Sequence, residues 1–262
     1  MIKKNSLVNY LWFCLILITA TAIPVAGAYD SFFYLSPRTG IHSAGFFSTD
    51  AVVDAVMELK RTNPELKTPD LINYAQILVV LKEYFRNDFS GRRGMELGIT
   101  SQTMNLFRYL QKNGCHMRGA GYDAPTGENF THDGIDNYLK TLAGKGEYDF
   151  IYARQVLTTP SSFRNSLELF VKIYEGIHSN LKNGGYFITI DDFSEVLDRK
   201  MSLPTETIVN LGFEIVDEFY ISGISVVERD SSSIPMRLMI FRKTGAFPFQ
   251  GLSTEAQILS SL

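Results

Sequence analysis

The chain has 262 residues, of which 45% are hydrophobic and 20% charged. This composition is typical of a globular protein with a sizeable core, and it excludes disordered, collagen-like and disulfide-rich chains. The 25 Lys and Arg residues against 28 Asp and Glu give a net charge of −3, so no chain-wide positive field attracts a nucleic-acid backbone. We expect one principal domain and no nucleic-acid partner.

The first 28 residues have the order of a signal peptide. Lys3 and Lys4 give a basic start, residues 11–18 are apolar, and the small residues 26–28 offer a cleavage position. The alternative is an uncleaved membrane anchor, because residues 7–28 carry no charge and could span a bilayer as a helix. Either way we expect the rest of the chain in a periplasm, a secretory lumen or the medium, contacting a membrane only through this segment if it is uncleaved.

Cysteine and histidine are too sparse and too scattered for a disulfide framework or a metal site. The two cysteines are Cys14 and Cys115, and cleavage after Ala28 would leave only the second. One thiol cannot close an intrachain disulfide, and the four histidines show no paired ligand spacing. We therefore expect a fold held by its core, with no metal.

Residues 29–90 are predicted to form an N-terminal arm followed by two helices. The segment 29–47 is rich in Gly, Ser and aromatic residues without periodicity, which favours an irregular arm. Ser48-Thr49-Asp50 is typical of a helix N-cap, and apolar residues at helical spacing continue to Lys60. A second helix is predicted from Thr68 to about Arg86.

Residues 91–245 alternate short apolar strands with helical segments and are followed by a tail, 246–262. This alternation predicts an α/β fold with a doubly wound, mostly parallel sheet covered by helices on both faces. The last two strands have no room for a helix between them, which favours an antiparallel hairpin at one edge of the sheet. The predicted strands are 94–98, 115–122, 148–152, 186–190, 213–220 and 236–242, and the predicted helices are 103–112, 136–143, 163–181 and 195–211.

Polar or acidic residues follow the predicted strands, where ligands of open parallel sheets bind near the switch in strand order. Gly98, directly after the first strand, lets the backbone approach a ligand without a Cβ. A carboxylate after the second strand can accept two hydrogen bonds from a ribose diol. The polar and acidic candidates are Asp123, His132-Asp133, Arg154-Gln155 and Asp191-Asp192.

Between about residues 93 and 243, the sequence resembles the class I S-adenosylmethionine-dependent methyltransferases. The resemblance rests on Glu96-Leu97-Gly98, Gly121-Tyr122-Asp123, His132-Asp133-Gly134, the strand 148–154, the turn 181–186 and the closing hairpin. It implies a Rossmann-like fold and S-adenosylmethionine as the cofactor. It also implies cofactor contacts from Glu96, Gly98, Thr100, Asp123, Asp133 and Arg154.

The loop after the first strand departs from the family. Thr100 and Gln102 stand where relatives carry the second and third glycines, so side-chain atoms replace open space beside the cofactor's methionine portion. Two functions therefore stay open: methyl transfer to a small-molecule or protein acceptor, and an exported non-catalytic binding protein that has lost the cofactor. A nicotinamide-dependent oxidoreductase fits less well, because it needs the glycine-rich loop even more. No catalytic residue is assigned, since methyl transfer from a sulfonium depends mainly on alignment.

Overall fold

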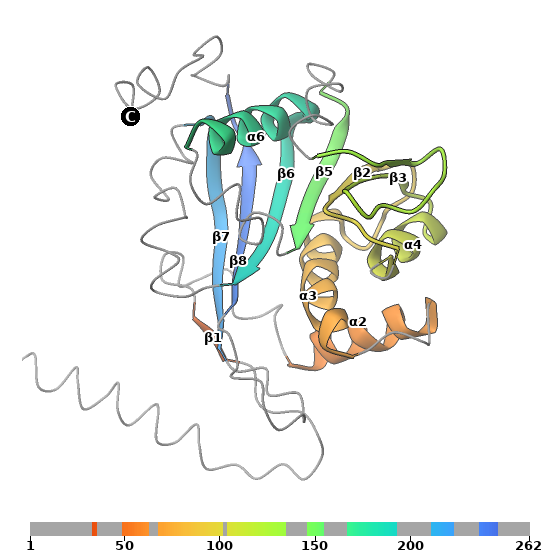
Figure 1. Ribbon diagram of the computed structural model, residues 1–262. Coiled ribbons are helices and arrows are strands. Elements are labelled where there is room, and N and C mark those ends of the chain that lie inside the picture. The colour runs from red at the N-terminus through yellow and green to blue at the C-terminus, as the bar shows by residue number, and fades with distance from the viewer. Residues whose placement is uncertain are drawn as a thin grey trace, which may run out of the picture.

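One eight-stranded sheet organises the computed structural model, which describes residues 33–35, 49–62, 68–101, 104–134, 146–154, 167–192, 211–222 and 236–245. The strand order is β1-β7-β8-β6-β5-β2-β3-β4 (Figure 1). The strands are β1 (Phe33–Leu35), β2 (Arg93–Leu97), β3 (His116–Ala120), β4 (Phe130–Thr131), β5 (Tyr148–Arg154), β6 (Leu181–Asp192), β7 (Phe213–Ser222) and β8 (Met236–Lys243).

The pairing directions give the sheet a switch point between β2 and β5. The chain runs from β2 to β3 and β4 on one side and then to β5 and β6 on the other, all parallel. This confirms the doubly wound, mostly parallel sheet with an antiparallel C-terminal hairpin. The hairpin β7–β8 lies at one end of the sheet, with β8 next to β6, and the three-residue strand β1, which was not expected, extends the sheet by pairing with the outer side of β7.

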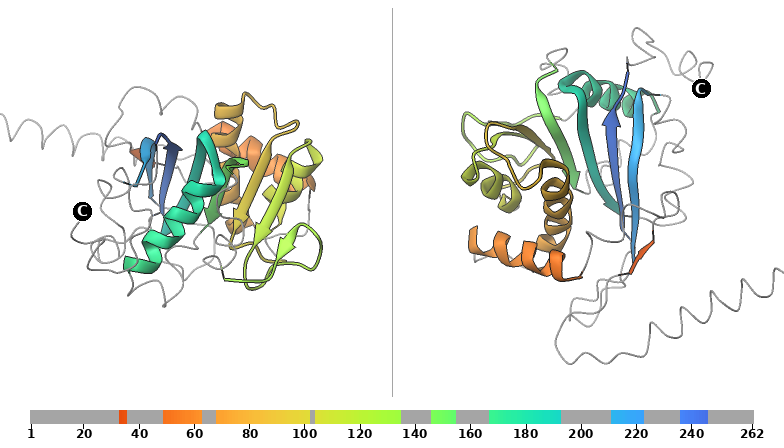
Figure 2. Two further views of the ribbon diagram at one scale, coloured as in Figure 1. Left: turned by 90° about the horizontal axis from the view of Figure 1, so that it is seen from above. Right: turned by 180° about the vertical axis from the view of Figure 1, so that it is seen from behind.

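Helices cover both faces of the sheet, as Figure 2 shows from above. The two predicted N-terminal helices are present as α2 (Thr49–Thr62) and α3 (Thr68–Phe85), and with α4 (Asn105–Lys112) they lie on one face. The other face carries α6 (Leu167–Asn180), whose Tyr174 makes edge-on contacts with Phe187, Phe213 and Phe241. The predicted helices 136–143 and 195–211 lie outside the described residues, apart from Leu211.

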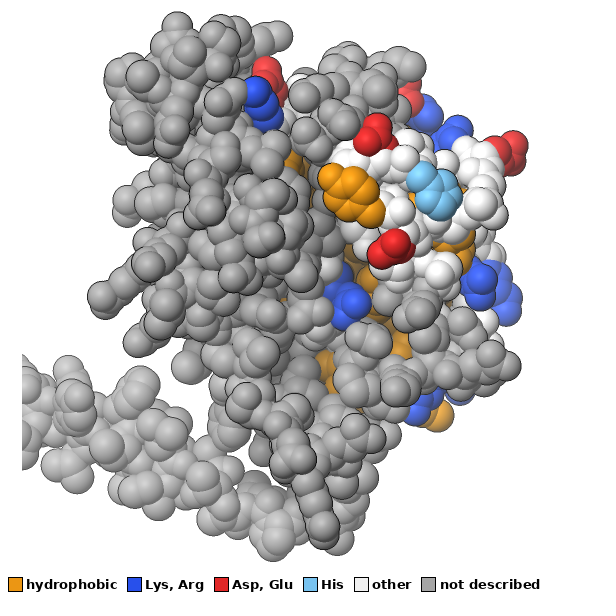
Figure 3. All heavy atoms as spheres, viewed as in Figure 1, with side chains coloured by type: hydrophobic (Ala, Val, Ile, Leu, Met, Phe, Trp, Pro, Cys, Tyr) orange, Lys and Arg blue, Asp and Glu red, His pale blue; other side chains and the backbone are white. Residues whose placement is uncertain are grey.

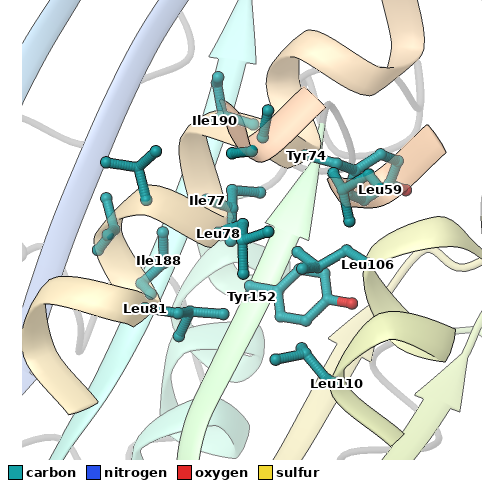
Figure 4. Close-up of a cluster of buried hydrophobic side chains, with 14 of the residues drawn as sticks. Leu59, Tyr74, Ile77, Leu78, Leu81, Leu106, Leu110, Tyr152, Ile188 and Ile190 are labelled. Carbon is teal, nitrogen blue, oxygen red and sulfur yellow. The ribbon is translucent and has the colours of Figure 1, made fainter. Parts of the chain in front are cut away.

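Helix α3 is central to the core. Every residue from Leu71 to Leu81 is buried, the polar Asn73 and Gln76 included, which fits a helix that packs against the protein on all sides. Its side chains Ile77, Leu78 and Leu81 cluster with Ile188 of β6 and Tyr152 of β5 (Figure 4). The helix therefore lies directly on the strands beside the switch point.

Three short features differ from the sequence prediction. The two-residue strand β4 was not predicted, because two residues give no periodicity, and β1 falls in a segment expected to be irregular. Strand β6 starts at Leu181, directly after α6, rather than at Tyr186. The Gly184-Gly185 pair marks an irregularity within the β5–β6 pairing instead of a loop: a Cβ on Gly185 would lie 2.9 Å from the Lys182 carbonyl oxygen.

The signal-peptide segment 1–28 and the tail 246–262 lie outside the described residues. Among the helices that are described, none combines the length and the apolar character needed to cross a membrane.

Candidate functional site

The loop after β2 is bonded to the segment that follows β3. The N–H groups of Gly98 and Ile99 both donate to the carbonyl oxygen of Ala120, at 2.7 and 3.3 Å, and the N–H of Ser101 donates to the carbonyl oxygen of Asp123 at 3.2 Å. Gly98 has a φ of +78°, a conformation that favours glycine. The two loops therefore form one unit at the carboxyl edge of the sheet, beside the switch point.

Glycine is required on the β3 side of this unit as well. A Cβ on Gly121 would lie 2.6 Å from the carbonyl oxygen of Ile99, and one on Gly119 would lie 2.9 Å from the Ile99 side chain. Ile99 itself is fully buried and anchors the loop. Sequence reasoning missed this role, although the run of small residues from Gly119 to Gly121 was its signal.

The predicted carboxylates lie on the surface beyond this unit. Asp123 is exposed, and its neighbour Tyr122 is 78% exposed, an unusual position for a large aromatic side chain. Asp133 is half-buried and accepts a hydrogen bond from the N–H of Gly134 at 2.7 Å, and His132 is exposed. Figure 3 shows acidic side chains, a histidine and a hydrophobic side chain close together on the side of the molecule where β2 and β3 lie.

Glu96 lies beneath the surface at the end of β2. Its side chain is 1% exposed, and its two carboxylate oxygens accept hydrogen bonds from Tyr74 at 2.8 Å and Tyr152 at 2.6 Å. Burial raises the pKa of Glu96 to about 7, although the two tyrosines and the charge of Arg154 partly oppose the shift. The same burial and the carboxylate raise the pKa of Tyr152 well above its usual range. The structure thus gives Glu96 protein partners on both oxygens.

Arg154 ends β5 next to this buried cluster. Its guanidinium lies over the ring of Tyr74, 5.1 Å from the centroid, and the side chain is half-buried. Because Tyr148, Phe150, Tyr152 and Arg154 alternate along β5, Arg154 lies on the same face as Tyr152. Sequence reasoning found Glu96 and Arg154 but missed Tyr74 and Tyr152, which are 22 and 56 residues from Glu96.

Of the two residues that stand in place of glycines in the loop after β2, the structure describes one. Thr100 is half-buried in the bonded loop, and Gln102 lies outside the described residues.

Asp191 and Asp192, predicted after a later strand, belong to the end of β6, and Gln155 is outside the described residues. Within the described ranges, no three His, Cys, Asp or Glu side chains are grouped as metal ligands.

Comparison with known proteins identifies the fold. The N-methyltransferase NodS from Bradyrhizobium japonicum, solved with S-adenosyl-L-homocysteine, superposes with a TM-score of 0.50 at 14% identity, over 74% of this chain and 99% of NodS. The described domain has the class I methyltransferase fold. At this identity the similarity establishes the fold alone.

Further solved methyltransferases are similar at a lower score. The 1,6-didemethyltoxoflavin-N1-methyltransferase of Burkholderia thailandensis is 15% identical, with 74% of this chain and 89% of that one covered and a TM-score of 0.48. An S-adenosylmethionine-dependent methyltransferase from Archaeoglobus fulgidus is 15% identical, with 65% and 94% covered and a TM-score of 0.45. No protein-family model and no curated protein sequence matches the chain.

Proposed function

We propose that this chain binds S-adenosylmethionine at the carboxyl edge of its sheet and transfers the methyl group to a small-molecule or protein acceptor. One observation carries the proposal: in a class I methyltransferase fold, the exposed Asp123 follows β3 and Arg154 ends β5, and these two strands lie on the two sides of β2. Ligands of open α/β sheets bind at this kind of switch point.

The residues at this edge offer a donor or acceptor for each part of the ligand. Asp123 can accept hydrogen bonds from both ribose hydroxyls, and Asp133 lies on the neighbouring loop where it can accept from the adenine amino group. Arg154, stacked on Tyr74 and near the charge of Glu96, can pair with the carboxylate of the amino-acid portion. Gly98 has no Cβ, which leaves space for the ligand to approach the backbone.

The bonded loop changes how the ligand is held. Because the N–H groups of Gly98, Ile99 and Ser101 already donate to carbonyl oxygens, the proposed affinity comes from side chains rather than from loop amides. When bound, S-adenosylmethionine supplies a methyl group on a positively charged sulfur. The protein's contribution is alignment and exclusion of water, so a general base is not required for the transfer itself.

The test is isothermal titration of the full chain with S-adenosylmethionine and S-adenosylhomocysteine. We expect one site per chain, strongly weakened in Asp123→Ala and in Arg154→Met. Asp54→Ala removes an exposed carboxylate on α2, which is not part of the loops after β2 and β3, and should bind normally. Absence of binding at millimolar ligand, in protein that is folded by circular dichroism, would reject the proposal.

A second candidate is an exported binding protein without catalysis. The loop after β2 favours this candidate. Thr100 stands where relatives carry a glycine, and three N–H groups of the loop already donate to backbone carbonyl oxygens. Failure of both ligands to bind, together with a cooperative unfolding transition, is its expected result. Binding with one-to-one stoichiometry would argue against it.

We also propose that the protein acts outside the cytoplasm, on the basis of the basic, apolar and small-residue order within Met1–Ala28. Intact mass measurement of protein recovered from an exporting host should show a mature chain that begins at Tyr29. Full-length protein in the soluble cytosol would contradict this, and full-length protein in the membrane fraction would indicate an anchor.

A further inference from the structure

A separate groove lies at the amino ends of the strands, across the sheet from Asp123. Its volume is about 610 Å³, and its lining includes Arg93 at the start of β2, His116 and Arg118 on β3, and Tyr148 at the start of β5. Small-molecule sites have volumes of this order. None of the described lining residues is acidic.

The sheet register concentrates the three basic side chains. Arg93 pairs with His116 across the parallel β2–β3 ladder, and Arg118 is two residues further along β3. Since neighbouring strands lie about 4.8 Å apart and side chains alternate between faces, the three side chains project from one face at close spacing. Arg93 and Arg118, which stay cationic in proteins, are therefore diagonal neighbours across the ladder, so that one bound anion could contact both.

Both guanidinium groups are held in place by neighbouring groups. Arg93 forms an ion pair with Glu147 at 2.7 Å and lies over the ring of Tyr148, 6.0 Å from the centroid. Arg118 donates from Nη1 to the backbone carbonyl oxygen of Glu128. Each guanidinium has five N–H donors, so these contacts fix its orientation while leaving further donors for a ligand.

We infer that this groove binds a small molecule that carries a phosphate group. Two guanidiniums and an imidazole lie together on one face of the sheet, and this number of donors suits the three oxygens and double charge of a phosphate better than the two oxygens and single charge of a carboxylate. The groove is larger than phosphate alone requires, so we expect an organic portion to occupy the remainder. The inference is independent of the proposed methyl transfer, because no residue is shared between the two edges.

The test is isothermal titration of the full chain with inorganic phosphate and with glycerol 3-phosphate, at constant ionic strength. We expect saturable binding that weakens about tenfold or more in Arg118→Gln and in Arg93→Gln, as expected for loss of a charge-assisted hydrogen bond. Tighter binding of glycerol 3-phosphate would support an organic portion, and equal binding would support a site for free phosphate.

Arg242→Gln is the matched control, since Arg242 is also ion-paired, with Glu214 on β7, and its loss changes the net charge equally. It should leave phosphate binding unchanged, as should Asp123→Ala at the opposite edge. If Arg93→Gln unfolds the protein by breaking the pair with Glu147, the exposed Arg118 still decides the question. Absence of saturation at millimolar phosphate, or equal loss in Arg242→Gln and Arg118→Gln, would overturn the inference.

Discussion

The hydroxyl of Tyr152 donates to the carboxylate of Glu96 across the β2–β5 ladder, where the two residues are direct neighbours in register. Tyr74 of α3 occupies the other carboxylate oxygen. Glu96, beside the switch point, is thus held by Tyr152 of β5 and Tyr74 of α3. The resemblance to the methyltransferases did not associate either tyrosine with it. The ionisation of Glu96 near neutral pH links the chemistry of this cluster to the stability of the fold.

Glu96 should make the protein less stable as the pH rises from about 4.5 to about 7. Its pKa in the folded chain, about 7, lies above the ordinary value of 4.5, so the folded state binds more protons than the unfolded state in this window. The free energy of unfolding should fall by up to about 3 kcal/mol across it. Urea unfolding at pH 5 and pH 8 measures the change, and Glu96→Gln should remove most of it. An unchanged slope in that variant would contradict the assignment.

His178 should produce the opposite slope. Its imidazole is buried against Phe213 and near Lys243, and burial followed by the lysine charge lowers its pKa to about 4. Between pH 4 and 6.5 the unfolded state therefore binds more protons, and stability rises with pH. The variant His178→Gln should lose this rise, which is best measured in the Glu96→Gln background. A rise of the same size without the histidine would exclude His178 as its source.

Gly121→Ala should loosen the bonded loops. The added Cβ would lie 2.6 Å from the carbonyl oxygen of Ile99, a backbone atom that cannot move without shifting the loop after β2. We expect a loss of about 1–3 kcal/mol in unfolding free energy and weaker binding of S-adenosylhomocysteine. Gly245→Ala is the control, because its Cβ would meet nothing within 4 Å. Equal stability of the two variants would show that the loop accommodates a side chain.

Asp149 should stabilise the start of three strands. Its carboxylate accepts hydrogen bonds from the Arg93 N–H and from Lys182, both at 2.8 Å, and lies 3.5 Å from Arg92. Burial alone would raise its pKa, but Lys182, the Arg93 N–H and Arg92 lower it overall.

The variant Asp149→Asn should therefore lose about 1–3 kcal/mol at neutral pH, measured by urea unfolding. A folded pKa below the ordinary 3.8 means that this stabilisation is present above that pH and declines as the pH falls through the folded pKa. The difference between wild type and variant should shrink accordingly in acid. Asp54→Asn, on the exposed surface of α2, should unfold like the wild type at every pH.

The sequence predicted what local patterns encode. Alternating apolar segments gave the parallel strands, and helical spacing gave α2 and α3, because these periodicities are set within a few residues. The residues around Glu96 could not be predicted in this way, since Tyr74 and Tyr152 are distant in the chain and meet it only through tertiary packing. The same reason applies to the position of β8 between β6 and β7. The apolar pattern predicts that a segment is a strand, but it does not determine which strands lie next to it.

The pairing of β1 with β7 joins residues 33–35 to residues 220–222. During synthesis, β1 emerges long before β7, the strand with which it pairs. Contacts between such distant segments form late, because closing a long loop costs entropy before any contact compensates for it. Completion of this sheet edge would therefore be a late step of folding, and a chain truncated before β7 would leave its earliest strand without that partner.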